Sequence, residues 1–501
     1  MLAPSVRSSH PRDPLIFALL AALALACSSP PRATTANRVP GPLPPVSAAS
    51  EVSPGAASAT PRRHVVVVSI DGLMPATYTE PDAHGLQVPT LRRLRAQGAY
   101  SPGMETVFPS VTYPAHVSMV TGVAPARHSI ISNHGWDPEH RNDEGWRWYA
   151  EDIQVPTLWQ RAREHGQRTA LLHWPATVGA DASALVPDFW RARTADDVKL
   201  TRALSTPGLL ERVAQRFPDF WQHYEPWKPS PRSAFDIAIH LLESEPPELM
   251  LIHTLKVDDA QHRHGLFSEQ AKDRIERADR QLGRLMAAIE RLGLWPRTTL
   301  VVLSDHGFAP LHTRFRPNHR LKELGLLPED ESRKLSWWKA LTVAAGGLAY
   351  VYVAKEDDQA TKDLLLQTFA ELARQPDSPI RRIFSQDDIR ARGGDPQAFL
   401  ALEASPGVRL STTLDGQTVT RLGNKGTHGY PPDRPEMNGA LLIYGRGIVK
   451  GRIDGARVID IAPTVAAWLG FAMPGVEGRA LALPESAAPG VTGSPGRPDR
   501  P

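Results

Sequence analysis

Uninterrupted runs of apolar, mostly β-branched residues recur along the chain, and the clearest of them end at polar or charged residues. These runs cover residues 64–70, 168–173, 248–255, 298–304 and 440–444. Runs of this length are typical of strands that are buried on both faces of a parallel sheet. The pattern therefore predicts a covered sheet rather than a sheet with one face in water.

Helical periodicity fills the gaps between these runs, at residues 90–97, 157–164, 269–292 and 461–469. Strands that alternate with helices indicate an α/β fold, here a doubly wound and mostly parallel sheet flanked by helices. Ligand sites in such folds lie at the carboxyl ends of the strands. Asp71 and Asp305 directly follow two of the runs, so we expect both at that edge.

Two regions do not follow the alternation. Residues 194–247 are rich in Trp and Pro, which favours a lid or cap. Residues 315–421 combine a helical stretch at 358–374 with a strand-like run at 347–354 and a hairpin-like segment at 408–420, whose turn would be Asp415-Gly416. We expect this second region to be an inserted α+β subdomain.

The two ends of the chain have a different character. Arg7 and Arg12 precede the run 15–26, whose twelve apolar residues are fewer than the roughly 20 that span a bilayer. A basic start and a short apolar run predict an export signal over 1–27. Residues 28–61 and 484–501 are rich in Pro, Ala, Ser and Gly, which predicts a disordered linker and tail around a folded part at 62–483.

The segment 23–27 resembles a bacterial lipoprotein signal, with Cys27 as the lipidated residue. The alternative is a soluble secreted protein that is cleaved near Ala26. We expect an exported protein of the periplasm or cell envelope, with a lipid anchor at Cys27.

The composition of the chain limits which partners and which kinds of metal site are possible. The formal net charge is only +3 over 501 residues, so we expect no specific nucleic-acid binding, and no pattern points to a protein partner. The single cysteine excludes a disulfide scaffold, a cysteine zinc cluster and an iron–sulfur site. Any metal must be held by His, Asp, Glu or hydroxyl groups, and 18 histidines are present.

Acidic and imidazole side chains gather after the predicted strands. Asp305 and His306 are adjacent, so they can bind one ion from two sides, and Asp258 and His262 are one helical turn apart. His428 adds an imidazole in a Gly-bearing loop. Each of these, like Asp71, could alone be a helix cap, a turn former or a solvated loop residue. Their joint occurrence favours a metal site.

A candidate nucleophile lies in the segment 107–122. Thr112 is expected to cap a helix that has Pro114 in its first turn. A hydroxyl there lies beside free backbone N–H groups and the positive end of the helix, which suits a phosphate. A purely structural cap is the alternative.

Taken in order, these residues resemble the nucleotide pyrophosphatase/phosphodiesterase family of the alkaline phosphatase superfamily, from about Val65 to Leu469. The resemblance rests on Asp71-Gly72, Phe108-Pro109, Thr112-Tyr113-Pro114, His116, Thr121-Gly122, Pro125, His128, Asn133, His173-Trp174-Pro175, Asp258, His262, Asp305-His306-Gly307, His428-Gly429 and residues 460–464. It implies that residues 62–483 are an alkaline-phosphatase-like catalytic domain. It also implies hydrolysis of phosphodiester or phosphoanhydride bonds through a covalent phospho-threonine.

The resemblance assigns roles to individual residues. Thr112, rather than Ser110, would be the nucleophile, and Asn133 would bind a phosphoryl oxygen together with a backbone N–H near Tyr113. Two divalent ions, for which zinc is suited, are implied. The first would be held by Asp258, His262 and His428, and the second by Asp71, Asp305 and His306 with Thr112 in contact.

Several questions stay open at this point. Tyr113 and Trp174 could each stack on a base or aryl group of a small phosphodiester or nucleotide substrate, or could simply pack. A phosphomonoesterase or phosphonate hydrolase would need a further cation at the phosphate, for which Arg191 and Arg193 are candidates. A binding protein without catalysis and a transferase of phospho-headgroups are the remaining alternatives. A sulfatase is not expected, because Ser110 lacks the Cys/Ser-x-Pro-x-Arg context that the superfamily's sulfatases need.

Overall fold

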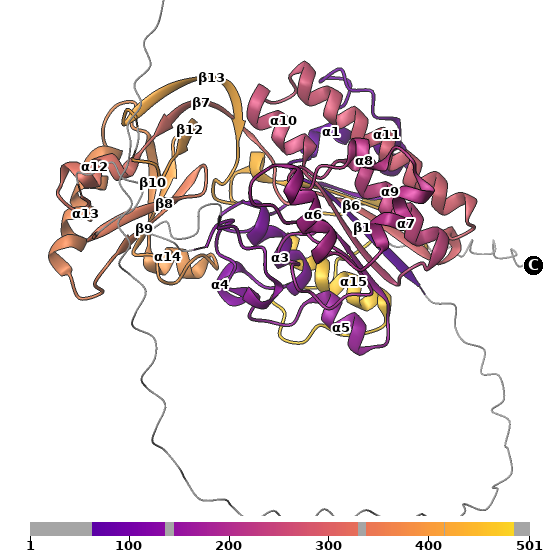
Figure 1. Cartoon of the computed structure of the whole chain (residues 1–501). Coiled ribbons are helices and arrows are strands. Elements are labelled where there is room, and N and C mark those ends of the chain that lie inside the picture. The colour runs from indigo at the N-terminus through magenta and orange to yellow at the C-terminus, as the bar shows by residue number, and fades with distance from the viewer. Residues whose placement is uncertain (1–62, 136–144, 329–336, 415, 485–501) are drawn as a thin grey trace, which may run out of the picture. The chain divides into compact units, whose positions relative to one another are not determined.

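An eight-stranded sheet, mostly parallel, forms the centre of the fold (Figure 1). Its order is β15-β2-β14-β6-β1-β5-β3-β4, with bounds β1 His64–Ile70, β2 Ala99–Met104, β3 Thr169–Leu172, β4 Ala184–Val186, β5 Leu249–Thr254, β6 Thr298–Leu303, β14 Gly439–Gly445 and β15 Gly451–Arg452. Strands β6, β1, β5, β3 and β4 are parallel neighbours, while β14 runs antiparallel to β6 and β2. Every residue of β1, β5 and β6 is buried, which confirms the predicted covered sheet.

The computed structural model describes residues 63–135, 145–328, 337–414 and 416–484. The export signal, Cys27, nearly all of the linker and tail, and Asp415 lie outside these residues. In the described ranges, no helix combines the length and the apolar character that crossing a membrane requires.

Helices cover both faces of the sheet (Figure 1). Alternate β1 residues point to opposite faces, because side chains alternate along a strand. Val66 and Val68 join an apolar cluster with α2 (Pro89–Gln97), α7 (Leu209–Arg216), α9 (Pro231–Ser244) and α11 (Glu269–Arg291). Val65 and Val67 join a second cluster with α3 (Thr112–Thr121), α5 (Leu158–Glu164) and α15 (Ile461–Leu469). The doubly wound α/β prediction is confirmed.

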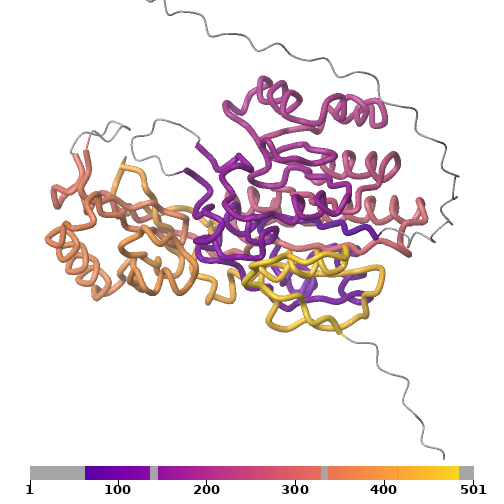
Figure 2. The backbone as a smooth tube through the Cα atoms, turned by 90° about the horizontal axis from the view of Figure 1, so that it is seen from below, coloured from indigo at the N-terminus to yellow at the C-terminus, as the bar shows by residue number. Residues whose placement is uncertain are grey.

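A second part, built by residues 309–427, is an α+β arrangement with an apolar core of its own (Figure 2, orange). It has a four-stranded sheet, β10-β11-β9-β8, and a three-stranded sheet, β12-β7-β13. Its elements are β7 Ala309–Phe315, α12 Pro317–Glu323, β8 Ala340–Ala344, β9 Leu348–Val353, α13 Gln359–Ala373, β10 Ile380–Ser385, α14 Gln386–Ala391, β11 Leu400–Ala404, β12 Gly407–Leu410 and β13 Val419–Thr427. The predicted helix and strand appear as α13 and β9.

The hairpin predicted over 408–420 is wrong. β12 and β13 do not pair with each other, because β7 lies between them, parallel to β12 and antiparallel to β13. An Asp-Gly pair is a local turn signal, and it carries no information about a strand from far upstream that enters between its two arms.

The segment expected to be a cap contains several helices. α6 (Ala195–Leu204), α7 and α8 (Phe220–His223) precede α9. Phe235 and Ile237 of α9 lie in the same apolar cluster as β1, so α9 is part of the layer that covers the sheet. A capping role for the shorter helices, and the exact domain boundaries, stay predictions.

Candidate active site

The carboxyl ends of three neighbouring parallel strands meet at one edge of the sheet. Asp71 directly follows β1, Asp305 follows β6, and α10 (Lys256–His264) begins just after β5. Because β1 lies between β5 and β6, side chains at these three exits converge. This is the edge at which the sequence placed the site.

One group of ligand-type side chains consists of Asp71, Asp305 and His306. Their ligand atoms all lie within 4.8 Å of one another. His306 Nε2 lies 3.1 Å from Asp305 Oδ2 and 3.5 Å from Asp71 Oδ1. All three side chains are fully buried.

A second group of ligand-type side chains consists of Asp258, His262 and His428. The helical turn of α10 brings His262 Nε2 to 3.4 Å from Asp258 Oδ1, and His428, just after β13, brings its Nε2 to 3.7 Å from the same oxygen. The rings of His306 and His428 stack with centroids 3.6 Å apart, so the two groups are adjacent. All six predicted ligands are therefore together.

A backbone carbonyl orients each of the three imidazoles. The Nδ1–H groups of His262, His306 and His428 donate to the carbonyl oxygens of Gly426, Gly307 and Ser110, at 3.0, 3.1 and 2.9 Å. This fixes the tautomer and leaves each Nε2 lone pair available for a metal ion. Backbone anchoring of this kind is the usual companion of metal-binding histidines.

Several buried atoms of the two groups have no hydrogen-bond partner among the described residues. They are Asp71 Oδ1, Asp258 Oδ1, Asp305 Oδ2 and His306 Nε2. An unpartnered buried carboxylate is costly, and a cation bound between the side chains would remove the cost. The donor set, carboxylate oxygens and imidazole nitrogens without a thiolate, suits zinc, although not uniquely. The residues present fit divalent metal ions.

Electrostatics at the site favour a cation as well. Burial and the neighbouring charge of Asp305 raise the pKa values of Asp71 and Asp258 well above the usual range. Burial lowers the pKa of His262 to about 4, and that of His428 also falls well below its usual range. The lowered pKa values favour the neutral form of the imidazoles, which is the form that binds a metal ion. A positive ion would stabilise the ionised form of the crowded carboxylates.

Thr112 lies at the start of α3, but it does not cap the helix. Val111, in an extended conformation, is the N-cap residue, so Thr112 is the first helical residue and no side-chain cap hydrogen bond forms. The predicted cap is therefore wrong by one position. The Thr112 side chain stays at the positive end of the helix and is 7% exposed.

Contacts to the first turn of α3 join Thr112 to both ligand groups. The Nδ1–H of His116 donates to the Thr112 carbonyl at 2.8 Å and lies 3.7 Å from Asp305 Oδ2. Ser110 Oγ donates to the Tyr430 carbonyl at 2.7 Å and accepts from the Gly429 N–H at 3.0 Å. Ser110 therefore holds the loop that carries His428. The Thr112 hydroxyl forms no such hydrogen bond with any residue that the structure describes.

Asn133 reaches the same helix end. Its Oδ1 accepts a hydrogen bond from the Tyr113 N–H at 2.9 Å. This leaves the Asn133 amide NH₂ available as a donor at this end of the helix. It also shows that the N–H near Tyr113 already has a partner in this structure, which the sequence did not reveal.

The two aromatic candidates are buried. Tyr113 is 1% exposed and donates from its hydroxyl to Asp188 Oδ2 at 2.8 Å. Trp174 is 0% exposed, and its ring packs edge-on against His116 with centroids 4.9 Å apart. Neither ring has an exposed face in this structure, which favours packing, and a substrate-stacking role for either ring stays a prediction.

His253, a residue that the sequence analysis missed, contacts the first ligand group from β5. Its Nε2 lies 3.1 Å from Asp71 Oδ2, and its Nδ1 lies 3.0 Å from the His173 carbonyl oxygen. The sequence feature that could have identified it is a lone imidazole in an otherwise apolar run. In the structure, His253 is in register with Ser69 of β1.

Arg191 and Arg193 precede α6. Their backbone N–H groups donate to the Asp197 carboxylate, and the Arg191 guanidinium lies 5.8 Å from the centre of the Trp148 ring. These contacts hold the loop before α6, and a role for either guanidinium at a phosphate stays a prediction.

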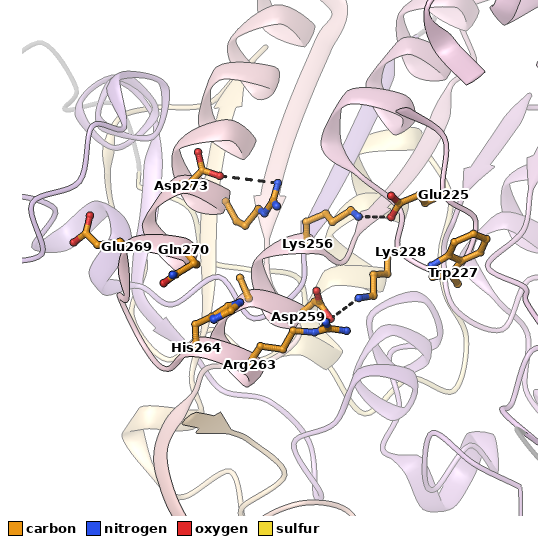
Figure 3. A pocket seen from close by; sticks show the side chains of 12 residues that line it. Glu225, Trp227, Lys228, Lys256, Asp259, Arg263, His264, Glu269, Gln270 and Asp273 are labelled. Atoms are coloured by element: carbon orange, nitrogen blue, oxygen red, sulfur yellow. Dashed lines mark hydrogen bonds and ion pairs between the residues drawn. The ribbon is translucent and has the colours of Figure 1, made fainter. Parts of the chain in front are cut away.

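A pocket of about 710 Å³ lies on the other side of α10 (Figure 3). Its charges are paired, with Lys228 Nζ 3.0 Å from Asp259 and Lys256 Nζ 2.5 Å from Glu225. Helical spacing separates this face of α10 from the face of Asp258 and His262. We therefore place no part of the reaction in this pocket.

Comparisons with known proteins agree with this geometry. The model of the family "Type I phosphodiesterase / nucleotide pyrophosphatase" matches residues 65–431. Human ectonucleotide pyrophosphatase/phosphodiesterase family member 1 is 25% identical over 255 residues, which cover 48% of this chain and 23% of that protein. Bis(5'-adenosyl)-triphosphatase enpp4 of Xenopus laevis is 23% identical over 257 residues, 50% of this chain and 48% of that protein. The chain thus spans from about a quarter to about half of these relatives.

Solved structures show the same fold. An inactive variant of murine ectonucleotide pyrophosphatase/phosphodiesterase 5 in complex with AMP has a TM-score of 0.58 and 16% identity, over 84% of this chain and 100% of that one. The human counterpart has a TM-score of 0.59 and 15% identity, over 83% and 97% of the two chains. With a family model that matches most of its length, the chain belongs to the type I phosphodiesterase / nucleotide pyrophosphatase family.

Proposed function

We propose that this chain is a metal-dependent phosphodiesterase or nucleotide pyrophosphatase that works through a covalent phospho-threonine at Thr112. The observation that carries the proposal is the pair of adjacent carboxylate–imidazole groups, one of which contacts the helix turn of Thr112 through His116. Membership of the family, the nucleotide-hydrolase names of the relatives and the AMP in a neighbouring structure support it.

Two divalent cations, which we infer to be zinc, would be held by these residues. Asp258, His262 and His428 would hold one, and Asp71, Asp305 and His306 the other, with the Thr112 hydroxyl beside it. When bound, such ions supply charge stabilisation for the phosphoryl oxygens and lower the pKa of a neighbouring hydroxyl.

The chain's own residues then account for the covalent steps. Thr112 Oγ attacks phosphorus, a bond forms between them, the bond to the leaving alcohol or phosphate breaks, and the leaving oxygen takes up, through solvent, the proton that the threonine hydroxyl gives up. Water next attacks phosphorus, the bond to Thr112 Oγ breaks, and the hydroxyl recovers its proton. The Asn133 amide, held by Tyr113 N–H, donates to a phosphoryl oxygen as charge develops there.

The decisive experiment compares Thr112→Ala with Thr121→Ser on the same helix. We expect Thr112→Ala to lower turnover of thymidine 5′-p-nitrophenyl phosphate about a thousandfold or more, since the nucleophile is lost. Thr121→Ser keeps its hydroxyl bond to the Val117 carbonyl and should retain full activity. Metal content by mass spectrometry and folding by circular dichroism should match wild type in both variants.

A trapped intermediate gives a second test. Acid quenching during turnover should preserve the covalent adduct, so mass spectrometry should find the peptide that contains Thr112 carrying the transferred phosphoryl group with its remaining ester substituent, a thymidylyl group for this substrate. A folded, metal-loaded Thr112→Ala enzyme that keeps a tenth of wild-type activity would overturn the assignment.

We also infer export to the cell envelope, with a lipid on Cys27. The basic and apolar pattern before Cys27 and the "ecto" in the relatives' names support this. A Cys27→Ser variant should move from the membrane fraction to the soluble envelope fraction, whereas unchanged membrane association would contradict the anchor.

A further inference from the structure

Two arginines lie side by side in the three-stranded sheet without a carboxylate partner. Arg314 of β7 and Arg409 of β12 are register partners, so their side chains leave the same face of the sheet. Both are partly buried, and the Nε atom of each is fully buried with no hydrogen-bond partner among the described residues. Within those residues, no acidic group forms an ion pair with either guanidinium.

The backbone on both sides of Arg409 is tied to the loop that carries His428. The Val408 carbonyl accepts from the Tyr430 hydroxyl at 2.5 Å, and the Leu410 N–H donates to the Gly346 carbonyl at 2.7 Å. The next residue, Gly347, donates its N–H to the His428 carbonyl at 2.8 Å. β12 is therefore fixed against the second ligand group rather than at a distant surface.

The direction of the Arg409 side chain follows from strand alternation. Val408 and Leu410 point into the apolar core of the second part, so Arg409 lies on the opposite face. Gly426 of β13 lies on this same face, and a Cβ there would be 2.8 Å from the Gln261 carbonyl oxygen of α10. The face that carries Arg409 is thus turned toward the helix of Asp258 and His262.

Two neighbouring, partly buried guanidinium groups are electrostatically unfavourable unless an anion lies between them. The two guanidinium groups repel each other, and the pKa of Arg409 is lowered by burial and by the charges of Arg314 and Arg316. Arginine binds phosphate with two parallel hydrogen bonds, and this gains most where water is partly excluded. A phosphate group placed next to the metal ligands would offset the cost for both arginines.

We propose that Arg409, assisted by Arg314, binds a second phosphoryl group of the substrate, next to the phosphorus that Thr112 attacks. The enzyme would then prefer phosphoanhydrides, such as nucleoside polyphosphates, over diesters that carry a single phosphoryl group. This inference rests on the proposed function and adds a substrate class to it.

Kinetics on two substrates test the proposal. We expect Arg409→Met to lower kcat/KM for ATP at least tenfold more than kcat/KM for thymidine 5′-p-nitrophenyl phosphate. Arg314→Met should shift the same ratio by about threefold. Arg409→Lys, which keeps the charge but not the paired hydrogen bonds, should shift it by an intermediate amount.

Arg421→Met is the matched control. Arg421 is an exposed arginine on β13, in register with Thr313 rather than with Arg314, so it lies on the other face of the same sheet. Its loss removes an equal charge, and both rates should stay within twofold of wild type. If Arg421→Met shifts the ratio as much as Arg409→Met, the effect is one of overall charge and the proposal falls.

A binding measurement tests the role of Arg409 without relying on catalytic activity. In the Thr112→Ala background, calorimetry should show inorganic pyrophosphate binding at least tenfold more weakly after Arg409→Met, with a smaller change for inorganic phosphate. Equal losses for the two anions, or equal losses on the two substrates, would overturn the second-phosphate site.

A folded, metal-loaded wild type that hydrolyses neither substrate would instead overturn the proposed function, and pyrophosphate binding would still decide the role of Arg409. Should Arg409→Met fail to fold, Arg409→Lys and Arg314→Met carry the same comparison.

Discussion

At the scale of single residues, the partners of the ligands matter as much as the ligands. His253 contacts Asp71 on one side and the His173 carbonyl on the other, and so fixes a carboxylate that is itself fully buried. Residues that orient metal ligands typically change affinity for the ion 10–100-fold when they are removed. His253 is thus a positioning residue.

A His253→Leu variant tests this role. It keeps an apolar strand but leaves Asp71 Oδ2 without its partner, so we expect metal affinity to fall about 10–100-fold, as measured by competition with a chelator. His264→Gln, an exposed histidine of α10, is the control and should bind metal as wild type does. Unchanged affinity in His253→Leu would contradict the role.

Asp188 provides a prediction about pH. Burial raises its pKa to about 7, although the hydrogen bond from Tyr113 works in the opposite direction. Between its ordinary pKa of about 3.9 and pH 7 the folded state binds more protons than the unfolded state, so stability falls as pH rises through this window.

Asp188→Asn should remove this dependence. We expect the free energy of unfolding of the wild type, from urea titration, to be higher at pH 5.5 than at pH 8, and the difference to shrink in the variant. Asp181→Asn, an exposed control, should keep the wild-type difference. Identical pH profiles for Asp188→Asn and wild type would contradict the raised pKa, because they would show that ionising Asp188 does not lower the free energy of unfolding.

At the scale of elements, the sequence predicts those parts that local chemistry decides. β1, β5 and β6 follow from apolar runs, and Asp258 and His262 follow from one helical turn. The Arg314–Arg409 pair depends on strands far apart in the sequence that become neighbours only in the folded sheet. No local pattern could place these arginines together, and the same is true of β7 between β12 and β13.

Helix α3 offers a test at this scale, because it begins at Thr112, ends at Thr121 and has Gly122 as its C-cap residue. Gly122 has a left-handed conformation, and an added Cβ would lie 2.7 Å from Val476 Cγ1. Gly166 has a similar φ, but a Cβ added there would have no atom within 4 Å. Gly166→Ala therefore measures only the cost of placing an L-residue in the left-handed conformation, which is about 1–2 kcal/mol. We expect Gly122→Ala to lose more stability than Gly166→Ala in urea titration, and equal losses would show that Val476 moves aside.

At the scale of the whole molecule, the candidate metal ligands come from two parts that have separate cores. Asp258 and His262 come from the helix after β5 of the main sheet, whereas His428 follows β13 of the second part. Ser110 adds a hydrogen-bonded tie between the loop before α3 and the residues after His428. An ion bound by all three ligands would therefore hold the two parts together.

Metal removal should accordingly lower stability as well as activity. Binding to the folded state alone adds about 4 kcal/mol when the free ion is at about 1,000 times its Kd. We expect a chelator to lower the melting temperature of the wild type by several degrees, and added zinc to restore it. In His428→Ala the chelator should have a smaller effect, because the ligand from the second part is missing, while His264→Gln should respond as wild type does. If the wild-type melting temperature does not change on chelation, the two carboxylate–imidazole groups do not hold structural ions, and the link between the two parts rests on direct contacts such as the Ser110 and His262 hydrogen bonds.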